Sequence, residues 1–266
     1  MKHQARKRFG QHFLVDRSVL ARIAQAVSPV ATERIVEIGP GLGALTEQLL
    51  ARVPVIDAVE IDRDLVARLR QRWPAALRLH EADALAFDFE ALAEGQRLRW
   101  VGNLPYNIST PLMIRMIDFT ASITDAHFML QKEVVDRIVA EPGGAAFGRL
   151  GVMMQAFFEV EALFEVPPEA FDPPPRVDSA VVRLRPLAVP RVRHRDTLER
   201  LLAVAFGQRR KMLRGTLLPW LAAQGMDALS PAIGLSPTDR PEVVSVADWC
   251  RLADLLGDQG RPIAAG

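Results

Sequence analysis

The segment Gly102-Asn-Leu-Pro-Tyr-Asn107 brings together groups that could prepare an aromatic amine for reaction. The exocyclic amine of a nucleobase is a poor nucleophile because its lone pair is delocalised into the ring. The Asn103 amide oxygen and the Leu104 backbone carbonyl could accept its protons, and Pro105 fixes the turn that presents that carbonyl. Tyr106, the one tyrosine of the chain, offers a face for an extruded base, which is worth roughly 1–3 kcal/mol. The alternative interpretation is a tight turn with a surface aromatic.

A glycine-rich turn at Gly39-Pro-Gly41 predicts a site for an adenosine-containing cofactor. Glycines allow a sharp turn and a close approach of the backbone to a ligand. Glu60 lies 21 residues after Gly39, a spacing at which a carboxylate can bind both hydroxyls of a ribose. The same glycines also satisfy the dinucleotide pattern. Two features argue against a nicotinamide cofactor: Pro40 has no N–H for a pyrophosphate, and the Glu37 carboxylate suits a cationic aminoacyl group and repels phosphate.

Asp83 is a further candidate, and the sequence contains no recognisable metal site. A carboxylate at Asp83, after the third predicted strand, could accept from the amino group of a cofactor adenine, although an aspartate there is more often a helix N-cap. The five histidines are scattered without the spacing of metal ligands, and Cys250 is the one cysteine. We therefore expect no metal.

These residues follow short apolar runs that alternate with helical patterns between residues 34 and 131. The alternation is typical of a mostly parallel sheet with helices on both faces, in which ligands bind at the carboxyl ends of the strands. Strands are expected at 34–38, 53–60, 77–81, 98–102, 126–131 and 177–185. Helices are expected at 44–51, 63–73, 110–119, 133–141, 196–206, 211–220 and 246–256.

A proline-containing interruption near residues 187–190 predicts two domains. We assign residues 1–188 to the α/β domain, 189–259 to a small all-helical domain and 260–266 to a disordered tail. The chain has 266 residues, 49% hydrophobic and 24% charged, which is an ordinary globular composition. A single cysteine, no apolar run near the roughly 20 residues of a membrane span and no signal peptide predict a cytoplasmic protein. Nothing in the sequence demands more than a monomer.

The net charge of +1 hides two basic clusters. Residues 187–215 hold eight Lys or Arg against two acids, a local charge of +6 that includes Arg209, Arg210 and Lys211. Arg6, Lys7 and Arg8 form the second cluster. Such clusters make the chain a candidate for binding a polyanion. From charge alone, solvated helix faces and a frayed tail explain them equally well.

Several long motifs occur in a fixed order along the chain: Arg6-Lys-Arg-Phe-Gly-Gln-His-Phe-Leu14, Val36-Glu-Ile-Gly-Pro-Gly-Leu42, Gly102-Asn-Leu-Pro-Tyr-Asn-Ile-Ser-Thr-Pro111, His127-Phe-Met-Leu-Gln-Lys-Glu-Val-Val135, Pro173-Pro-Pro-Arg-Val-Asp-Ser-Ala180 and Phe206-Gly-Gln-Arg-Arg-Lys211. Together they resemble the bacterial small-subunit ribosomal RNA adenine dimethyltransferases, the KsgA/RsmA family. The resemblance runs from about Lys7 to Leu256, and the ordered set is far more specific than any single motif.

The resemblance implies a Rossmann-like methyltransferase fold with a seven-stranded sheet that uses S-adenosylmethionine and releases S-adenosylhomocysteine. It implies dimethylation of N6 on two neighbouring adenines in the 3′-terminal hairpin of small-subunit (16S) ribosomal RNA (rRNA), on a late pre-30S assembly intermediate. Four methyl transfers follow, and they need no metal because a sulfonium methyl donor is already activated. The cofactor positions of the family carry over to His12, Leu14, Gly39, Gly41, Glu60, Asp83 and Asn103.

The resemblance also implies how the target base is held. Asn103 and Tyr106 match the base-binding pair, and Phe171 matches an aromatic that closes the other face of the adenine; from the residues alone Phe171 would pass as a core residue. The family often has Asn where this chain has His12, and either side chain could hydrogen-bond the aminoacyl end of the cofactor. Residues 9–14 would form a lid over the cofactor. The basic clusters would meet RNA, with phosphate contacts at residues 209–211 giving salt-sensitive affinity.

Three other functions are weighed against this one. A relative could methylate one large-subunit rRNA adenine and confer antibiotic resistance, but the segment 206–211 and the proline-rich loop favour the small-subunit enzymes. A non-catalytic assembly factor would not need the intact Asn103–Tyr106 motif and Glu60. A nicotinamide oxidoreductase would bind NAD, whereas the methyltransferase would bind S-adenosylmethionine.

Overall fold

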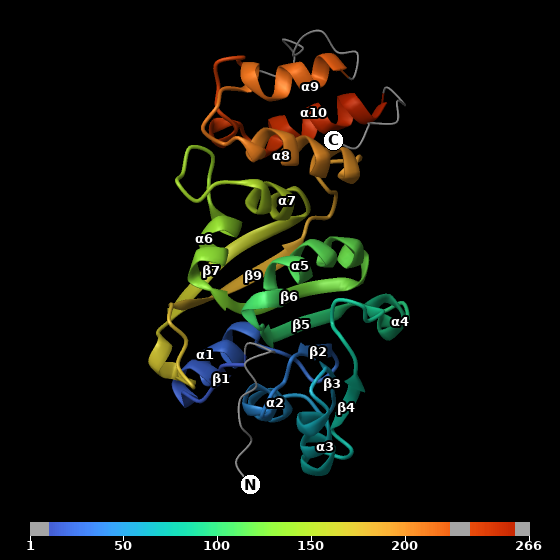
Figure 1. The fold of residues 1–266 in the computed structure, drawn as a ribbon. Coiled ribbons are helices and arrows are strands. Elements are labelled where there is room, and N and C mark those ends of the chain that lie inside the picture. Colours follow the sequence, from blue (N-terminus) through green and yellow to red (C-terminus); the bar gives the residue numbers. More distant parts are fainter. Residues whose placement is uncertain (1–10, 224–234, 259–266) are drawn as a thin grey trace. The chain divides into compact units, whose positions relative to one another are not determined.

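Figure 1 shows the computed structural model, which describes residues 11–223 and 235–258. Its main sheet has seven strands in the order β4-β3-β2-β5-β6-β9-β7. Strands β2 to β6 pair in parallel, and β9 pairs antiparallel with β6. The strands are β2 (Arg34–Ile38), β3 (Ile56–Glu60), β4 (Leu77–Glu81), β5 (Leu98–Asn103), β6 (Ile123–Gln131), β7 (Phe158–Val166) and β9 (Ser179–Pro186). The predicted α/β fold with a mostly parallel seven-stranded sheet is confirmed.

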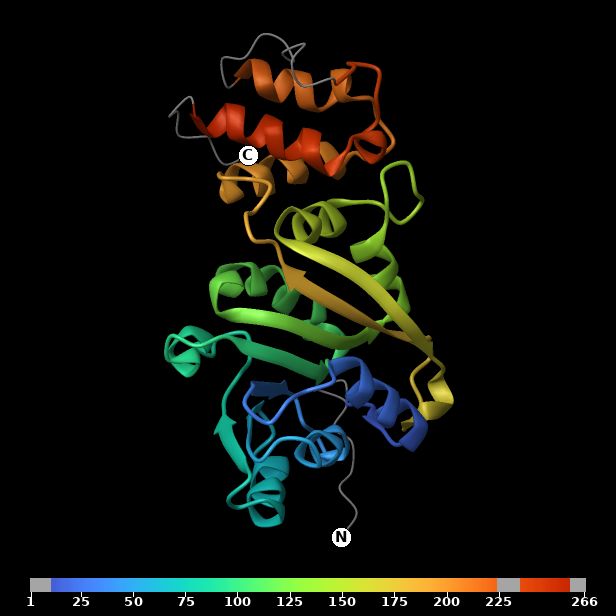
Figure 2. The same cartoon turned by 180° about the vertical axis from the view of Figure 1, so that it is seen from behind.

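Helices cover both faces of this sheet, as Figures 1 and 2 show from opposite sides. Alternation along β5 explains why both faces need cover, since successive side chains of a strand point to opposite faces. Val101 is buried in a cluster with residues of the first three helices, whereas Trp100 packs on Phe89 with ring centroids 4.0 Å apart. The helices of this part of the chain are α1 (Arg17–Val27), α2 (Ala44–Leu50), α3 (Arg63–Arg72), α4 (Phe89–Ala93), α5 (Tyr106–Met116) and a 3-10 turn at Ile117–Ser122.

A second, two-stranded sheet joins two segments that are distant in sequence. Strand β1 (Phe13–Leu14) pairs antiparallel with β8 (Phe171–Asp172), which follows a 3-10 turn at Pro168–Ala170. The N–H groups of Val15 and Asp16 continue the connection by donating to the carbonyl of Ala170. The amino-terminal segment is therefore bonded to the chain that precedes the proline-rich loop.

Some elements differ from the sequence expectations for identifiable reasons. The helix expected at 110–119 already begins at Tyr106: Pro105 (φ −55°, ψ 136°) precedes it with a non-helical backbone, and its carbonyl accepts from the N–H of Ile108 at 3.1 Å. The single helix expected at 211–220 is wrong: a 3-10 turn at Leu213–Gly215 and helix α9 (Leu217–Ala223) replace it. The N–H groups of Leu213 and Arg214 donate to the carbonyls of Asp239 and Pro237 instead of to a helix. Helix α1 and strand β7 were not expected.

Contacts group the described residues into two units. The first contains residues up to 135 and 160–186, and the second contains 136–159 and residues from 187 onward. The helices beyond α5 are α6 (Lys132–Val139), α7 (Arg149–Phe157), α8 (Arg195–Gly207), α9 and α10 (Val246–Asp258), with a 3-10 turn at Pro241–Val243. The predicted domain boundary at 188 lies beside the division between residues 186 and 187. Residues 136–159 are grouped with the second unit because α7 packs on α8 and α10. The predicted tail, 260–266, lies outside the described residues. No described helix is long and apolar enough to cross a membrane.

Gly102 is a position where the sheet leaves no room for a side chain. A Cβ there would lie 2.5 Å from the carbonyl oxygen of Ile38 on the neighbouring strand. Gly102→Ala is expected to lower the free energy of unfolding by roughly 1–3 kcal/mol, because β2 cannot move away without disturbing the ladder. Urea denaturation followed by circular dichroism measures the loss. Gly207→Ala is the matched control, since no atom lies within 4 Å of its added Cβ. Equal losses in both variants would contradict the packing argument.

Candidate functional site

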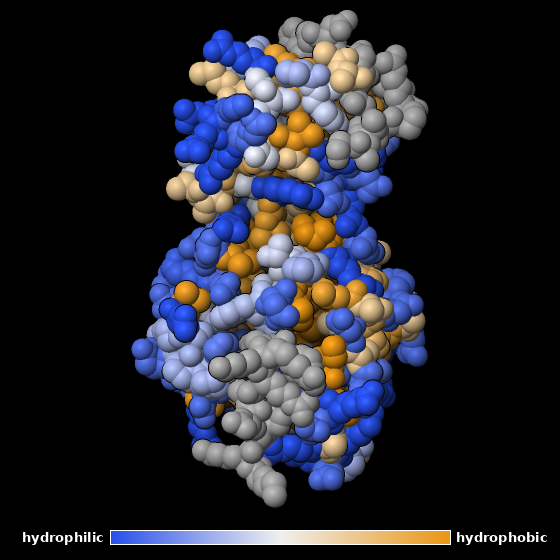
Figure 3. Space-filling view, viewed as in Figure 1, coloured by the Kyte–Doolittle hydropathy of each residue, from blue (hydrophilic) through white to orange (hydrophobic). Residues whose placement is uncertain are grey.

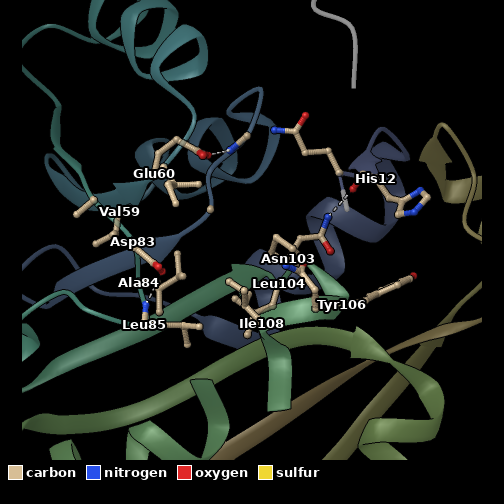
Figure 4. Close-up of a pocket in the computed structure, with 18 of the residues that line it drawn as sticks. His12, Val59, Glu60, Asp83, Ala84, Leu85, Asn103, Leu104, Tyr106 and Ile108 are labelled. Atoms are coloured by element: carbon tan, nitrogen blue, oxygen red, sulfur yellow. Dashed lines mark hydrogen bonds between the residues drawn. The ribbon is translucent and has the colours of Figure 1, made fainter. Parts of the chain in front are cut away.

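The carboxyl ends of β2, β3, β4 and β5 meet at a cavity of about 380 Å³. Parallel strands place their carboxyl ends at one edge of a sheet, so residues far apart in sequence converge there. In Figure 4, Glu60 and Asp83 lie on one side of Asn103, and His12 and Tyr106 lie on the other. The cavity is lined by eight of the predicted residues: His12, Gly39, Gly41, Glu60, Asp83, Asn103, Leu104 and Tyr106. Leu14 instead lines a hollow of about 40 Å³ that shares Gly39, Gly41 and Asn103 with the cavity.

The glycine turn that follows β2 adopts a backbone that other residues rarely take. Gly39 has φ +68° and Gly41 has φ +59°, on either side of Pro40. A Cβ on Gly41 would also lie 3.2 Å from the ring of Phe13, which approaches from the amino-terminal segment. The turn therefore requires glycine for its conformation, and Gly41 requires it for space as well.

Glu60, the last residue of β3, organises the backbone around the cavity. One carboxylate oxygen accepts from the N–H of Gly41 at 3.2 Å, and the other accepts from the N–H of Asp62 at 2.9 Å. The residue is 6% exposed, and this burial raises the pKa of its carboxyl, against the lowering effect of the N–H donors. A buried carboxylate at a cavity wall can accept from hydroxyl donors of a ligand.

Glu37 is a second buried carboxylate, one strand away. It is 1% exposed, and its Oε2 accepts from the Thr46 hydroxyl at 2.6 Å. Burial raises the pKa of Glu37 to about 7; the Thr46 bond opposes this shift and the nearby Glu60 charge adds to it. Glu37 lines the smaller hollow together with the glycine turn. The site therefore contains two carboxylates whose charged forms a cationic ligand would stabilise.

Asp83 begins a turn rather than a helix. Its Oδ1 accepts from the N–H of Leu85 at 2.9 Å, and its backbone carbonyl accepts from Ala86 and Phe87. Arg115 of α5 secures the same loop by donating to the carbonyls of Leu85 and Phe87. The Asp83 carboxylate consequently stays at the cavity wall, at the end of β4.

Asn103 is oriented by the backbone of the amino-terminal segment. Its Nδ2 donates to the carbonyl of His12 at 2.9 Å, as the dashed line in Figure 4 shows. The bond assigns the amide nitrogen to His12, so Oδ1 is the atom presented as an acceptor. The N–H of Leu104 donates to the carbonyl of Met129 on β6. This bond fixes the backbone at Leu104, whose own carbonyl is the second acceptor. Acceptors from two successive residues are thus held at the end of β5.

Tyr106 lies beside these acceptors at the start of α5. Its hydroxyl is 3.1 Å from the Ser179 hydroxyl, and its ring stacks on the His12 ring with centroids 5.6 Å apart. Burial raises the pKa of the phenol, although the Ser179 hydrogen bond partly offsets the effect. The His12 side chain does not point toward the glycine turn: its Nδ1–H donates to the carbonyl of Pro173 at 2.8 Å. The position of the ring favours a role for His12 beside Tyr106.

Several lining residues were not identified from the sequence. Ile61 is 46% exposed although it is large and apolar, and it lies directly after Glu60. An apolar residue directly after the acidic residue that ends a strand is only a weak indication of a ligand-binding position, because the same pattern also fits a core residue. The other unforeseen lining residues include Ala84, Leu85 and Ile108, whereas Gln11 and Phe13 belong to the segment 9–14 that was expected to lie over the cofactor.

Phe171 and the basic residues are not brought to the cavity. Phe171 is 4% exposed and packs in the core with Leu14 and Leu20, so its proposed contact with a base stays a prediction. Arg210 and Lys211 are exposed, whereas Arg209 donates to Glu242 at 2.8 Å and to the carbonyl of Ala145 at 2.6 Å. The predicted cluster at residues 6–8 lies outside the described residues. Within 11–223 and 235–258, no three His, Cys, Asp or Glu side chains are grouped to hold a metal ion.

Comparison with known proteins relates this arrangement to rRNA modification. The family model described as "Ribosomal RNA adenine dimethylase" matches residues 2–258. A curated relative from Dechloromonas aromatica, "Ribosomal RNA small subunit methyltransferase A", is 54% identical over 96% of this chain and 98% of its own. A dimethyladenosine transferase from Plasmodium falciparum has a similar fold, with a TM-score of 0.80, 23% identity and coverage of 95% and 100% of the two chains. The 23S rRNA methyltransferase ErmE has a TM-score of 0.69 and 26% identity, covering 92% and 99%.

Proposed function

The chain belongs to the ribosomal RNA adenine dimethylase family, and we propose that it methylates N6 of two adjacent adenines in the 3′-terminal hairpin of small-subunit rRNA. The methyl donor is S-adenosylmethionine, and four transfers complete the modification. The observation that carries the proposal is the juxtaposition, at one cavity, of the Asn103 and Leu104 acceptors, the Tyr106 ring and the buried Glu60 carboxylate.

The residues around the cavity fit S-adenosylmethionine. Glu60 supplies a carboxylate for the ribose hydroxyls, and Asp83 with the apolar Ile61 and Leu85 supplies a polar and an apolar wall for the adenine. Glu37 and the glycine turn suit the cationic aminoacyl end. When bound, the cofactor supplies a methyl group on a sulfonium, which needs no further activation.

The chain's own residues prepare the adenine amine. The Asn103 Oδ1 and the Leu104 carbonyl accept the N6 protons, which favours a pyramidal nitrogen whose lone pair is available for reaction. Tyr106 stacks on the base and holds the amine against these acceptors. The base must leave its own stack to reach them, and the stacking energy on Tyr106 offsets part of that cost.

The small subunit is the better supported target within the family. The "small subunit" relative is 54% identical to this chain, whereas ErmE, whose title names 23S rRNA, is 26% identical. We propose the late pre-30S particle as the partner, with a single copy of the chain acting on it in the cytoplasm. A role in assembly can accompany the reaction.

Transfer of labelled methyl from S-adenosylmethionine to small subunits that lack these methyl groups tests the function. We expect dimethyladenosine after digestion to nucleosides. Tyr106→Ala should abolish transfer while the dissociation constant of S-adenosylmethionine stays unchanged, because the base alone loses its stacking partner. An absence of label with intact cofactor binding would contradict the proposed substrate. A parallel loss of cofactor affinity in the variant would contradict the role of Tyr106.

Glu37 should link cofactor affinity to pH. Its carboxyl, with a pKa of about 7, is neutral in more acidic solution and gains its negative charge as the pH rises. The dissociation constant of S-adenosylmethionine should therefore fall between about pH 6 and about pH 7.5, measured by calorimetry. Glu37→Gln should abolish this dependence. Adenosine, which lacks the aminoacyl end that Glu37 is proposed to face, is the control and should depend less on pH. A dependence that persists in Glu37→Gln would assign it to another group.

The basic cluster of the second unit should contact RNA phosphates. Figure 3 shows hydrophilic side chains gathered over the loops that precede α9 and α10, and the exposed basic residues of those loops are Arg210, Lys211, Arg214 and Arg240. Replacing Arg210 and Lys211 by Gln should reduce the slope of log affinity against log salt by about 1 to 2. Arg209→Gln is the comparison. Because Arg209 also bonds Glu242 and Ala145, it should change the slope less and lower the melting temperature more. An unchanged slope in the double variant would mean a merely solvated surface.

A further inference from the structure

The Tyr106 hydroxyl is bonded to a residue outside the motif that carries Tyr106. Ser179 is the first residue of β9, is 1% exposed and places its Oγ 3.1 Å from the phenol oxygen. Its backbone is fixed as well, because Ser179 pairs with Gln131 in the β6–β9 ladder. The phenol is therefore anchored to the main sheet by a rigid, buried partner.

One face of the Tyr106 ring is held from the other end of the proline-rich loop. The His12 ring lies against it at an interplanar angle of 28°, and Pro173 fixes the His12 ring through Nδ1. The N–H of Lys132 donates to the carbonyl of Asp178 at 2.9 Å, which ties the loop to the end of β6. Residues 173–179 thus hold Tyr106 at two points, one indirectly through His12 and one directly through Ser179.

A stacking surface contributes to catalysis when its plane is already set before the base arrives. Tyr106 stands at the first position of α5, where neighbouring turns do not enclose its side chain as they would in the middle of a helix. Without a hydroxyl partner the half-buried ring could tilt about its side-chain torsions, and the amine would shift relative to Asn103. Small misplacements of a reacting group are costly in rate.

We propose that Ser179 is a positioning residue for methyl transfer, which fixes the orientation of the Tyr106 ring and through it the target base. The inference rests on the proposed function of Tyr106 as the base-stacking residue. It also gives a role to the motif Pro173–Ala180, which contains Ser179. The contacts proposed for the cofactor and for the base do not explain this motif. Ser179 itself does not touch the reacting atoms.

The test is a double-mutant cycle with Ser179→Ala and Tyr106→Phe, each of which removes the same hydrogen bond from one side. Each single variant should lower kcat for methyl transfer to unmethylated small subunits by about three- to tenfold, and the double variant should be no slower than the slower single one. The dissociation constant of S-adenosylmethionine should stay unchanged. Quenching of 2-aminopurine placed at the target position of an RNA hairpin should weaken in parallel, because that signal reports stacking.

Ser109→Ala is the matched control. Ser109 is equally buried at 1%, but its hydroxyl donates to the backbone carbonyl of Tyr106 at 3.0 Å and does not reach the phenol. Its effect should multiply with that of Tyr106→Phe. If Ser179→Ala lowers the melting temperature too far for assay, Tyr106→Phe decides the matter, because it leaves Ser179 in place.

The outcomes separate this inference from the proposed function. Wild-type kcat in Ser179→Ala or Tyr106→Phe, or effects that multiply in the double variant, would overturn the positioning role of Ser179. If Tyr106→Ala still abolishes transfer in that case, the base-stacking function stands. Full transfer by Tyr106→Ala would instead refute the stacking role on which the inference rests.

Discussion

Two buried carboxylates, Glu37 and Glu60, set the electrostatics on which the site depends. Each is nearly removed from water, which disfavours its charged form and raises its pKa. The Thr46 hydroxyl and the N–H groups of Gly41 and Asp62 compensate only in part. A ligand with positive charge supplies the missing compensation, and a ligand with phosphates aggravates the penalty. The glycine turn and Glu60 could serve either kind of cofactor, so it is the Glu37 carboxylate that favours a cationic ligand over a dinucleotide.

The amino-terminal segment completes the site by linking its two halves. Phe13 packs against Gly41 of the glycine turn, while the carbonyl of the preceding residue, His12, accepts from the Asn103 amide. Strand β1 holds both contacts in register because it pairs with β8. The proposed cofactor and base subsites therefore share one backbone segment, and a shift of that segment would alter the glycine turn and the Asn103 amide together.

The sequence predicts the strand-end residues well because parallel topology dictates their convergence. Gly39, Glu60 and Asn103 each end or follow a buried strand, and Asp83 follows the partly exposed edge strand β4, so the fold class alone places them at one edge. Partners from distant segments orient Asn103 and Tyr106: the His12 carbonyl accepts from the Asn103 amide, and the Ser179 hydroxyl bonds the Tyr106 phenol. No local sequence pattern encodes such pairings. The resemblance transfers Phe171 as a residue type without its setting: the side chain is 4% exposed, and its contact with a base stays a prediction.

Under the proposed function, the buried carboxylates that favour a cationic cofactor would also favour its replacement after each turnover. Methyl transfer would remove the sulfonium charge, so the ligand near Glu37 and Glu60 would carry one positive charge fewer, although its ammonium group stays. The two carboxylates would then bind the positively charged methyl donor more tightly than the product, which favours exchange of the product for a new donor. The four successive transfers proposed for the two adenines would require such exchange after each methyl group. A site that bound donor and product equally would have no such bias, and exchange would then depend on the relative concentrations of the two ligands alone.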